Sequence, residues 1–448
     1  MFQKVLIANR GEIAVRIIQA CRDLGIISVA VYSEADREAL HAQIADEAVC
    51  IGPARAAASY LNMDNIISAA LASGCQAIHP GFGFLSENPD FAERTTQAGL
   101  AFIGPTAATI RLMGDKSEAK RNAIAAGVPV ALGTDGPLRD FDEAISEAER
   151  IGYPVMLKAA SGGGGKGIRV ALSVKDLKDA YDSAAAEAVA NFGDGRLYME
   201  KYIHNPRHIE VQILGDSLGN VVHLFERECS VQRRHQKLIE ECPSAFVTPE
   251  LREKMTSAAV ALAKRVGYRS AGTIEFLVDN DRNFYFCEMN TRIQVEHPVT
   301  EQVTGVDLVC EQLRIAAGEP ISFKQEDLVM RGHAIECRIN AEDPSRNFAP
   351  CPGTLVSLHL PGGPGVRVDS AAYQGYKIPP FYDSMIGKLI VYGSDRTQAI
   401  DRMRRALAET LFEGVVTGTD YQMHILCSKA FVDANFNVNS IANGDFDQ

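Results

Sequence analysis

The sequence predicts a mixed α/β and α+β protein with more than one domain, and three observations support this prediction. Short apolar segments alternate with segments of helical spacing in about the first 114 residues, a pattern typical of a parallel sheet covered by helices. Alternating polar and apolar residues, typical of half-buried strands, dominate from about residue 168 to residue 299. The length of 448 residues corresponds to two to four domains at roughly 100–200 residues per domain.

The composition excludes several classes of protein. Apolar residues make up 46% of the chain and charged residues 23%, which are ordinary globular values and argue against a disordered or fibrous chain. The net charge of −12 would not attract a nucleic-acid backbone, so no nucleic-acid partner is expected. No apolar run approaches the roughly 18 residues that cross a bilayer, and the apolar run at residues 5–8 is too short for a signal peptide. We therefore expect a cytoplasmic protein without a membrane partner.

The ten cysteines are spread from Cys21 to Cys427, with no CxxC pair and no His/Cys cluster at zinc spacing. Most lie in apolar surroundings, as Cys50 and Cys287 do in the sequence. We therefore expect buried, reduced thiols that act as small apolar side chains.

The first region, residues 1–114, alternates strand and helix patterns. Strands are expected at residues 4–8 and 27–32, with a helix at residues 12–24 between them. Further helices are expected at residues 60–72 and 91–98, and further strands at residues 77–78 and 101–103. The loop after the first strand, Asn9-Arg10-Gly11-Glu12, lacks the GxGxxG of dinucleotide-binding folds. These patterns predict a Rossmann-like sheet without evidence for NAD.

The second region, residues 115–330, begins with expected helices at residues 116–126 and 141–151. An expected strand at residues 155–158 leads into a glycine-rich loop at residues 161–167, and another strand follows at residues 168–171. Because glycine has no Cβ, its backbone N–H groups can closely approach an anion, and Lys166 adds a positive charge. The loop is not a Walker A motif, because Lys166 is followed by glycine. It is interpreted as a flap over phosphates; the alternative is a hairpin tip without a chemical role.

An acidic hairpin is expected at residues 273–290. Strands at residues 273–278 and 284–290 are joined by Asn280-Asp281-Arg282-Asn283, which is typical turn composition. A four-residue loop would pair Asp279 with Phe284 and, further along the ladder, Glu275 with Glu288.

The pairing of Glu275 with Glu288 points to a metal ion. Two opposed carboxylates destabilise a ladder, whereas a hard cation such as Mg²⁺ between them would stabilise it. The alternation continues beyond the strand and is expected to keep one set of polar side chains on one face. That set consists of Glu288, Asn290, Arg292, Gln294 and Glu296. The solvated face of an edge strand is the alternative interpretation.

Cationic side chains complete the candidate site. They are a basic run at residues 232–237, the single lysines Lys116 and Lys158, and Arg338 in an expected strand at residues 333–340. Each has a simpler interpretation: an exposed basic loop, solvated lysines, and a surface ion pair of Arg338 with Glu336. Together, cations for polyphosphate, carboxylates for metal and a flexible cover favour phosphoryl transfer. The third region, residues 331–448, is expected to end in a helix near residues 397–411.

These motifs, taken in order, resemble the biotin carboxylase family of the ATP-grasp superfamily. The matching runs include IANRGEIA at residues 7–14, HPGFGFLSEN at residues 79–88, EMNTRIQVEHP at residues 288–298 and FYDSMIGK at residues 381–388. Shorter runs at residues 113–116, 199–202, 232–237 and 333–344 also match, and about the last 30 residues carry no matching motif. The resemblance implies a Rossmann-like domain at 1–114, an ATP-grasp domain at 115–330 with a lid at about 131–203, and a biotin carboxylase C-terminal domain at 331–448.

The resemblance also implies roles for individual residues. ATP would be bound by Lys116, Lys158, Gly163, Gly164, Gly165, Glu200, Lys201, Ile203, His208, Gln232, His235, Glu275 and Glu288. Two Mg²⁺ or Mn²⁺ ions would be bound by Glu275, Glu288 and Asn290. Bicarbonate would be bound by Lys237, Arg292, Gln294, Glu296 and the backbone of Val295. Arg338 would bind biotin, and the catalytic residues would be Glu296, Arg338, Arg292 and Lys237.

The implied reaction is the carboxylation of biotin by way of carboxyphosphate. Glu296, expected between Arg292 and Lys237, would act as the base on bicarbonate, and Arg338 would stabilise the biotin anion. The chain contains no Met-Lys-Met biotinylation motif, so biotin would be attached to a separate biotin carboxyl carrier protein. Carboxyltransferase subunits are further expected partners, the expected assembly is a homodimer, and the expected setting is acetyl-CoA carboxylase in fatty-acid synthesis. The alternatives are an ATP-grasp ligase that makes carbamoyl phosphate or a purine precursor, and a non-catalytic nucleotide-binding regulatory subunit.

Overall fold

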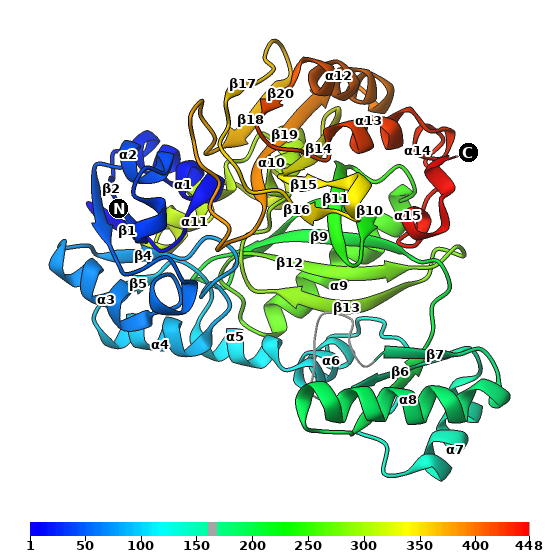
Figure 1. Cartoon of the computed structure of the whole chain (residues 1–448). Coiled ribbons are helices and arrows are strands. Elements are labelled where there is room, and N and C mark those ends of the chain that lie inside the picture. The colour runs from blue at the N-terminus through cyan, green and yellow to red at the C-terminus, as the bar shows by residue number, and fades with distance from the viewer. Residues whose placement is uncertain (160–167, 448) are drawn as a thin grey trace.

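The computed structural model describes residues 1–159 and 168–447 of the protein (Figure 1). The chain forms an N-terminal unit around a five-stranded sheet, a central eight-stranded sheet and a small three-stranded sheet. Two short strand pairs join β15 (Glu342–Asp343) to β16 (Ala349–Pro350) and β17 (Ser357–His359) to β20 (Leu411–Glu413). The predicted glycine-rich loop lies outside the described residues.

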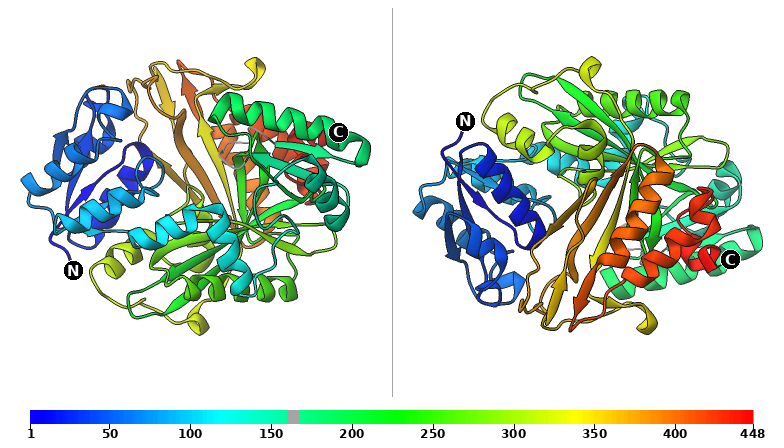
Figure 2. Two further views of the ribbon diagram at one scale, coloured as in Figure 1. Left: turned by 90° about the horizontal axis from the view of Figure 1, so that it is seen from below. Right: turned by 90° about the horizontal axis from the view of Figure 1, so that it is seen from above.

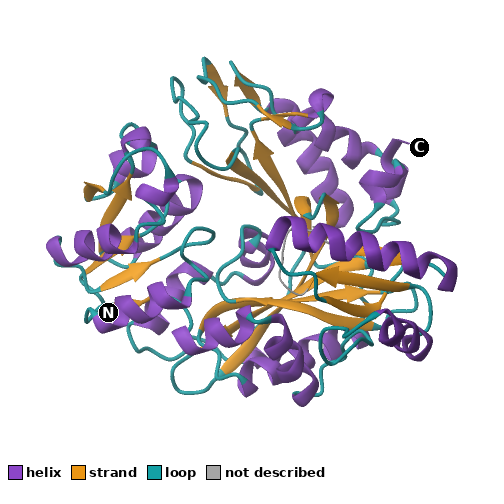
Figure 3. Ribbon diagram, turned by 60° about the horizontal axis from the view of Figure 1, so that its bottom comes forward, coloured by secondary structure: helices purple, strands orange, loops and turns teal. Residues whose placement is uncertain are grey.

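The N-terminal unit is a parallel sheet in the order β3-β2-β1-β4-β5, which confirms the predicted Rossmann-like architecture. Alternate residues of β1 face opposite sides: Val5 and Ile7 pack with Ile13 and Ile17 of α1, whereas Leu6 packs with Ile66 of α3. Figure 3 shows helices on both sides of this sheet. The strands are β1 (Lys4–Ile7), β2 (Ile27–Tyr32), β3 (Glu47–Cys50), β4 (Ala77–His79) and β5 (Ala101–Phe102). The helices are α1 (Gly11–Asp23), α2 (Leu40–Ile44), α3 (Met63–Ala72), α4 (Pro89–Gln97) and α5 (Ala107–Gly114).

The central sheet is antiparallel and has the order β13-β12-β9-β10-β11-β14-β19-β18. It therefore includes strands from both the second and the third predicted region, and β11 joins them by pairing with β14. Its strands are β9 (Arg207–Gly215), β10 (Val221–Arg233), β11 (Gln236–Cys242), β12 (Ser270–Val278), β13 (Phe284–Asn290), β14 (His333–Asn340), β18 (Val366–Ser370) and β19 (Met385–Gly393).

Helices cover the two halves of the central sheet separately. Helix α9 (Pro249–Arg265) packs on β9 and β10, and helix α12 (Arg396–Glu409) packs on β19 and β14. Helices α10 (His297–Thr304) and α11 (Leu308–Ala316) directly follow the acidic hairpin, and α11 contacts α1 of the N-terminal unit. Figure 2 shows the N-terminal unit beside the central sheet and the C-terminal helices against its last strands.

The small sheet has the order β7-β6-β8 and forms its own core with two helices. Its strands are β6 (Val155–Ala159), β7 (Ile168–Ala171) and β8 (Leu197–Lys201), and its helices are α7 (Phe141–Ile151) and α8 (Val174–Phe192). Helix α6 (Lys116–Ala125) precedes this unit in the chain. The unit falls within the predicted lid, whose boundaries, like those of the three predicted domains, stay predictions.

Two expectations about where the helices lie are wrong. Strand patterns do not dominate up to residue 299, because α8, α9 and α10 lie there; α9 buries Leu251, Met255, Ala259 and Leu262 at helical spacing. The chain also does not end in a helix near residues 397–411. Helices α13 (Thr419–Cys427), α14 (Lys429–Val432) and α15 (Ser440–Asn443) follow, and their region buries Ile425, Leu426, Phe431, Phe436 and Phe446 in the core beside β14 and β19.

The expected burial of the cysteines is correct for most but not all of them. Cys21, Cys75, Cys229, Cys242, Cys310 and Cys337 are buried, and none of the ten forms a disulfide within the described residues. Cys50 and Cys287, which the sequence places among apolar residues, are exposed. No helix in the described part of the chain has both the length and the apolar character needed to cross a bilayer.

The separate core of the small sheet makes Leu157→Ala a local test of the fold. Leu157 is fully buried in β6, and such a truncation costs about 2–5 kcal/mol. We expect faster hydrogen exchange in β6–β8, α7 and α8, with exchange in α9 and β12 unchanged. Val170→Ala is the matched control, because Val170 lies in the same sheet but is exposed. Equal acceleration throughout the central sheet would show that the unit has no separate core.

Candidate active site

The acidic hairpin places Glu275 of β12 directly opposite Glu288 of β13, as predicted. The expected register near the turn is wrong by one residue, because Val278, and not Asp279, pairs with Phe284. A bulge at Cys287, between the pairs Phe276–Phe286 and Glu275–Glu288, compensates for this shift. Both Cys287 and Glu288 are exposed at this bulge.

The two opposed carboxylates have different electrostatic surroundings. Glu275 is buried, which disfavours its charge, but Lys237 and His208 hold the pKa of Glu275 well below its usual range. Its Oε1 lies 3.0 Å from Lys237 Nζ and its Oε2 lies 3.1 Å from His208 Nε2. Desolvation and the charge of Glu275 raise the pKa of Glu288, although the Glu288 side chain reaches solvent.

These residues fit a divalent cation. Within the described residues Glu288 has no ion pair, so a cation would relieve its repulsion with Glu275. Asn290 adds an amide and donates from Nδ2 to Glu275 Oε1 at 2.9 Å. Carboxylate and amide oxygens are the ligands that Mg²⁺ and Mn²⁺ prefer.

Lys237 of β11 lies at the centre of the site. Its Nζ is 2.7 Å from Glu210, 3.0 Å from Glu275 and 2.6 Å from Glu296. Burial disfavours the ammonium charge, but the surrounding acidic groups raise the pKa of Lys237 well above its usual value. Lys237 therefore stays charged and holds three carboxylates in one place.

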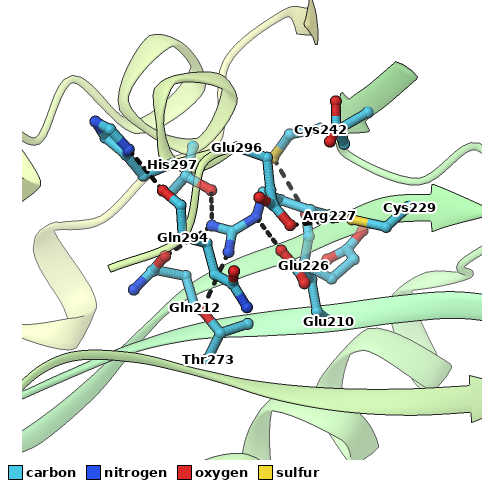
Figure 4. A network of polar contacts seen from close by, with 12 residues as sticks. Glu210, Gln212, Glu226, Arg227, Cys229, Cys242, Thr273, Gln294, Glu296 and His297 are labelled. Atoms are coloured by element: carbon cyan, nitrogen blue, oxygen red, sulfur yellow. Dashed lines mark hydrogen bonds and ion pairs between the residues drawn. The ribbon is translucent and has the colours of Figure 1, made fainter. Parts of the chain in front are cut away.

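Sequence reasoning missed Glu210, which contacts Lys237, and Arg227, which contacts Glu210. Arg227 is fully buried in β10 and donates to Glu210 Oε1 at 2.5 Å. It also donates to Gln212, to Thr273 and to Thr300 of α10 at 2.7, 3.1 and 2.9 Å. Figure 4 shows its guanidinium among these side chains, next to Glu296. The alternation of Glu210 and Gln212 with apolar residues in β9 is the sequence signal that could have found this network.

Glu296 is fully buried just before the first residue of α10. Its Oε1 accepts from Lys237 at 2.6 Å and its Oε2 accepts from Arg338 Nη2 at 2.9 Å. Burial disfavours its charge, but Lys237 and Arg338 hold the pKa of Glu296 well below its usual range. The expectation that Arg292 and Lys237 flank Glu296 is therefore wrong in one partner, because Arg338 takes that position.

Arg338 is not part of a surface ion pair with Glu336. It lies in β14 and donates from Nε to Glu240 of β11 at 2.6 Å as well as to Glu296. Burial raises the pKa of Glu240 to about 7, although Arg338 opposes this shift. The pairing of β11 with β14 thus brings Arg338 to the candidate base from a distant part of the sequence.

Arg292 contacts the N-terminal unit. It donates from Nε to Glu87 at 2.8 Å, from Nη1 to Gln294 Oε1 at 2.7 Å and from Nη2 to Asn290 Oδ1 at 3.2 Å. Strand β13 ends at Asn290, so the predicted alternating face does not continue as a strand. Hydrogen bonds of Arg292 nevertheless keep Asn290 and Gln294 together. Glu87 is a further residue that sequence reasoning missed, although it lies in a matching motif.

The predicted nucleotide-binding residues are divided between the small sheet and the central sheet. Lys158 of β6 donates to Glu200 of the neighbouring β8 at 2.5 Å, and Lys201 donates to the carbonyls of Gly152 and Tyr153 at 2.9 and 2.8 Å. The remaining positions are an exposed Lys116 at the start of α6, a buried Ile203, a buried Gln232 in β10 and an exposed His235 in the β10–β11 turn. Gly163, Gly164 and Gly165 lie outside the described residues.

Comparison with known families identifies the chain. Residues 1–110 match the biotin carboxylase N-terminal domain, residues 115–324 match the ATP-binding domain of the carbamoyl-phosphate synthase L chain, and residues 336–443 match the biotin carboxylase C-terminal domain. The chain belongs to the biotin carboxylase family. It is an ATP-dependent ligase that carboxylates biotin.

Individual relatives are similar over nearly their whole length. Biotin carboxylase 1 of Bacillus subtilis is 55% identical over 99% of each chain, and one of the pyruvate carboxylase subunits of Methanothermobacter thermautotrophicus is 56% identical over 96% of this chain and 88% of its own. Among solved structures, a biotin carboxylase complex with β-γ-ATP from Campylobacter jejuni has a TM-score of 0.94 at 49% identity over 99% of both chains. A biotin carboxylase domain dimer of Hydrogenobacter thermophilus 2-oxoglutarate carboxylase, in complex with MgADP, ADP and bicarbonate, has a TM-score of 0.93 at 52% identity, with 100% of this chain and 99% of that chain covered.

The three carboxylates around Lys237 predict a pH-dependent defect in Lys237→Met. The lowered pKa values of Glu275 and Glu296 contribute stability above the unfolded-state pKa of about 4.3, and this contribution is lost at lower pH. Without Lys237 the carboxylates repel, so we expect a loss of about 3–5 kcal/mol in the free energy of unfolding at pH 7.5. The deficit shrinks towards pH 4.5, because carboxylates that have lost one of their cationic partners take up protons more readily.

Urea unfolding of both proteins at pH 7.5 and pH 4.5 measures this difference. Lys178→Met is the matched control, because Lys178 forms an exposed ion pair with Asp182 at 2.8 Å, with 57% of each side chain exposed. We expect that control to change stability by less than about 1 kcal/mol at either pH. An equal deficit of Lys237→Met at both values would contradict the proposed electrostatic role.

Proposed function

We propose that Glu296, between Lys237 and Arg338, is the base that starts biotin carboxylation, and this arrangement carries the proposal. Bicarbonate would bind beside Lys237, Arg292, Gln294 and the backbone of Val295. Glu296 removes the bicarbonate proton, and the resulting oxyanion attacks the γ-phosphorus of ATP, which releases ADP and forms carboxyphosphate. Lys237 supports this step because its charge lies where negative charge develops.

The second step takes place near Arg338. Carboxyphosphate breaks down to CO₂ and phosphate, and the phosphate removes the N1′ proton of biotin. The guanidinium of Arg338 is permanently charged and stabilises the oxygen of the resulting ureido anion, which attacks CO₂. Because carboxyphosphate is labile in water, the small sheet and the glycine-rich segment would cover it.

The nucleotide lies between the small sheet and the central sheet in this proposal. Lys116, Lys158, Gly163, Gly164 and Gly165 bind phosphates, while Glu200, Lys201, Ile203, His208, Gln232 and His235 surround the rest of ATP. Glu275, Glu288 and Asn290 would hold Mg²⁺ or Mn²⁺, which would supply positive charge to the phosphoryl group during transfer.

The wider setting is proposed as acetyl-CoA carboxylase in the cytoplasm, where biotin carboxylation is the first half-reaction of that enzyme in fatty-acid synthesis. The partners are a biotin carboxyl carrier protein, carboxyltransferase subunits and a second copy of the chain. Full-length similarity to separate biotin carboxylases supports this setting. The relative that belongs to a pyruvate carboxylase has a similar identity and favours pyruvate as the second candidate acceptor. Affinity purification of the tagged chain, followed by an assay of the recovered complex with acetyl-CoA and with pyruvate, separates the two.

The metal assignment predicts that ADP release requires Mg²⁺ or Mn²⁺ as well as bicarbonate, and that free biotin increases its rate. Glu288→Gln removes one carboxylate, so the Mg²⁺ concentration for half-maximal rate is expected to rise about 10-fold or more. Asp281→Asn is the matched control, because Asp281 is an exposed carboxylate at the other end of the same hairpin. Undiminished turnover in excess chelator would overturn the metal assignment.

The division of labour between Glu296 and Arg338 is tested by the ratio of carboxybiotin to ADP. Arg338→Gln is expected to lower carboxybiotin formation by about 10²-fold, the usual loss for a transition-state donor. Bicarbonate-dependent ATP cleavage is expected to fall less, because Glu296 keeps its contact with Lys237 at 2.6 Å. Glu296→Ala is expected to lower both activities. An equal fall of both rates in Arg338→Gln would place Arg338 in the bicarbonate step instead.

A further inference from the structure

Two sequence motifs that the proposed chemistry does not use meet beside the candidate bicarbonate site. Glu12 comes from the IANRGEIA run in α1, and Lys388 comes from the FYDSMIGK run in β19. Lys388 Nζ donates to the backbone carbonyl of Val295 at 2.8 Å and lies 3.2 Å from Glu12 Oε1. Lys388 is 0% exposed, so this contact joins the N-terminal unit, the bicarbonate segment and the C-terminal strands in a buried place.

The peptide group on the other side of Val295 has its own buried partner. His297 Nδ1 lies 2.8 Å from the carbonyl oxygen of Gln294, and Figure 4 shows this contact. Because a carbonyl oxygen can only accept, Nδ1 carries the hydrogen. Burial holds the pKa of His297 well below its usual value, so the ring is neutral and Nε2 is unprotonated. His297 is fully buried, and its Nε2 has no hydrogen-bond partner within the described residues.

We propose that Lys388 and His297 are positioning residues that fix the peptide groups on both sides of Val295 and thereby aim its N–H at bicarbonate. The carbonyl of Gln294 and the N–H of Val295 belong to one planar peptide, so fixing the oxygen also fixes the hydrogen. Lys388 fixes the next peptide, which leads into Glu296. The inference rests on the proposed binding of bicarbonate by the Val295 backbone.

The charge of Lys388 is balanced by acidic groups from other elements. Glu12 lies at 3.2 Å and Asp369 of β18 at 4.0 Å. Such a buried pair could serve stability alone, since removal of one partner leaves an uncompensated charge. A positioning role differs because it affects the Michaelis constant for bicarbonate but leaves that for ATP unchanged.

The experiment compares bicarbonate KM in variants that remove or keep each donor. Lys388→Met removes the ammonium, and Lys388→Met combined with Glu12→Gln also removes the opposing charge and restores stability. His297→Leu removes the ring donor, whereas His297→Asn keeps an N–H at the position of Nδ1. Arg396→Met is the control for a lost buried ion pair, because Arg396 pairs with buried Glu241 at 2.7 Å and does not contact residues 292–296 in the described contacts.

We expect bicarbonate KM to rise about 10-fold or more in the Lys388 variants and in His297→Leu. This is the usual loss when a hydrogen bond to a charged group, here from the Val295 N–H to the bicarbonate anion, is weakened. His297→Asn and Arg396→Met should keep it within about 2-fold of the parent value, and ATP KM should stay constant throughout. If Lys388→Met does not fold, the comparison of His297→Leu with His297→Asn tests the inference instead.

Gln294→Ala distinguishes the two ways in which the inference can fail. If Gln294→Ala raises bicarbonate KM while the double variant and His297→Leu leave it unchanged, the positioning role is wrong but the bicarbonate site stands. If Gln294→Ala also leaves it unchanged, the proposed bicarbonate site is wrong and the positioning role fails with it.

Discussion

The buried ammonium group of Lys237 is the interaction on which the candidate site depends. It lies within 3.0 Å of three buried carboxylates, from Glu210, Glu275 and Glu296, which would otherwise repel one another. Arg227 fixes the position of this cluster, because it donates to Glu210 and also to Thr300 of α10. The alternation of fixed cations and anions lets one small volume contain both a metal site and a base.

The central sheet is what brings these charges together. Lys237 lies in β11, Glu275 in β12 and Arg338 in β14, and the continuous ladder from β13 to β18 fixes their relative positions. The N-terminal unit is linked to this sheet by ion pairs at the site itself, through Glu87 with Arg292 and Glu12 with Lys388. The family motifs in distant parts of the sequence therefore meet because they share contacts around one cluster.

Local pattern was sufficient to predict the parallel N-terminal sheet and the opposition of Glu275 and Glu288. The second prediction succeeded even though the turn register was wrong, because the bulge at Cys287 compensates for one residue, and no alternation rule anticipates a bulge. The partner of Glu296 could not be predicted, because the contact with Arg338 depends on β11 pairing with β14, which lies far along the chain. Helix α8 was missed because alanine forms most of its buried face, whereas α9 carries Leu251, Met255 and Leu262 at helical spacing, a signal that was present in the sequence and overlooked.

The two cations that contact Glu296 also set how strong a base it can be. Flanked by Lys237 at 2.6 Å and Arg338 at 2.9 Å, Glu296 is ionised but a weak proton acceptor, because both cations stabilise its charged form. A bound bicarbonate anion would share Lys237, and its negative charge would raise the pKa of Glu296 towards the value that proton transfer requires. Arg292, held by Glu87 at 2.8 Å, is one further cation that could turn towards the anion. Base strength would then develop only when the substrate is present, which couples bicarbonate binding to the first chemical step.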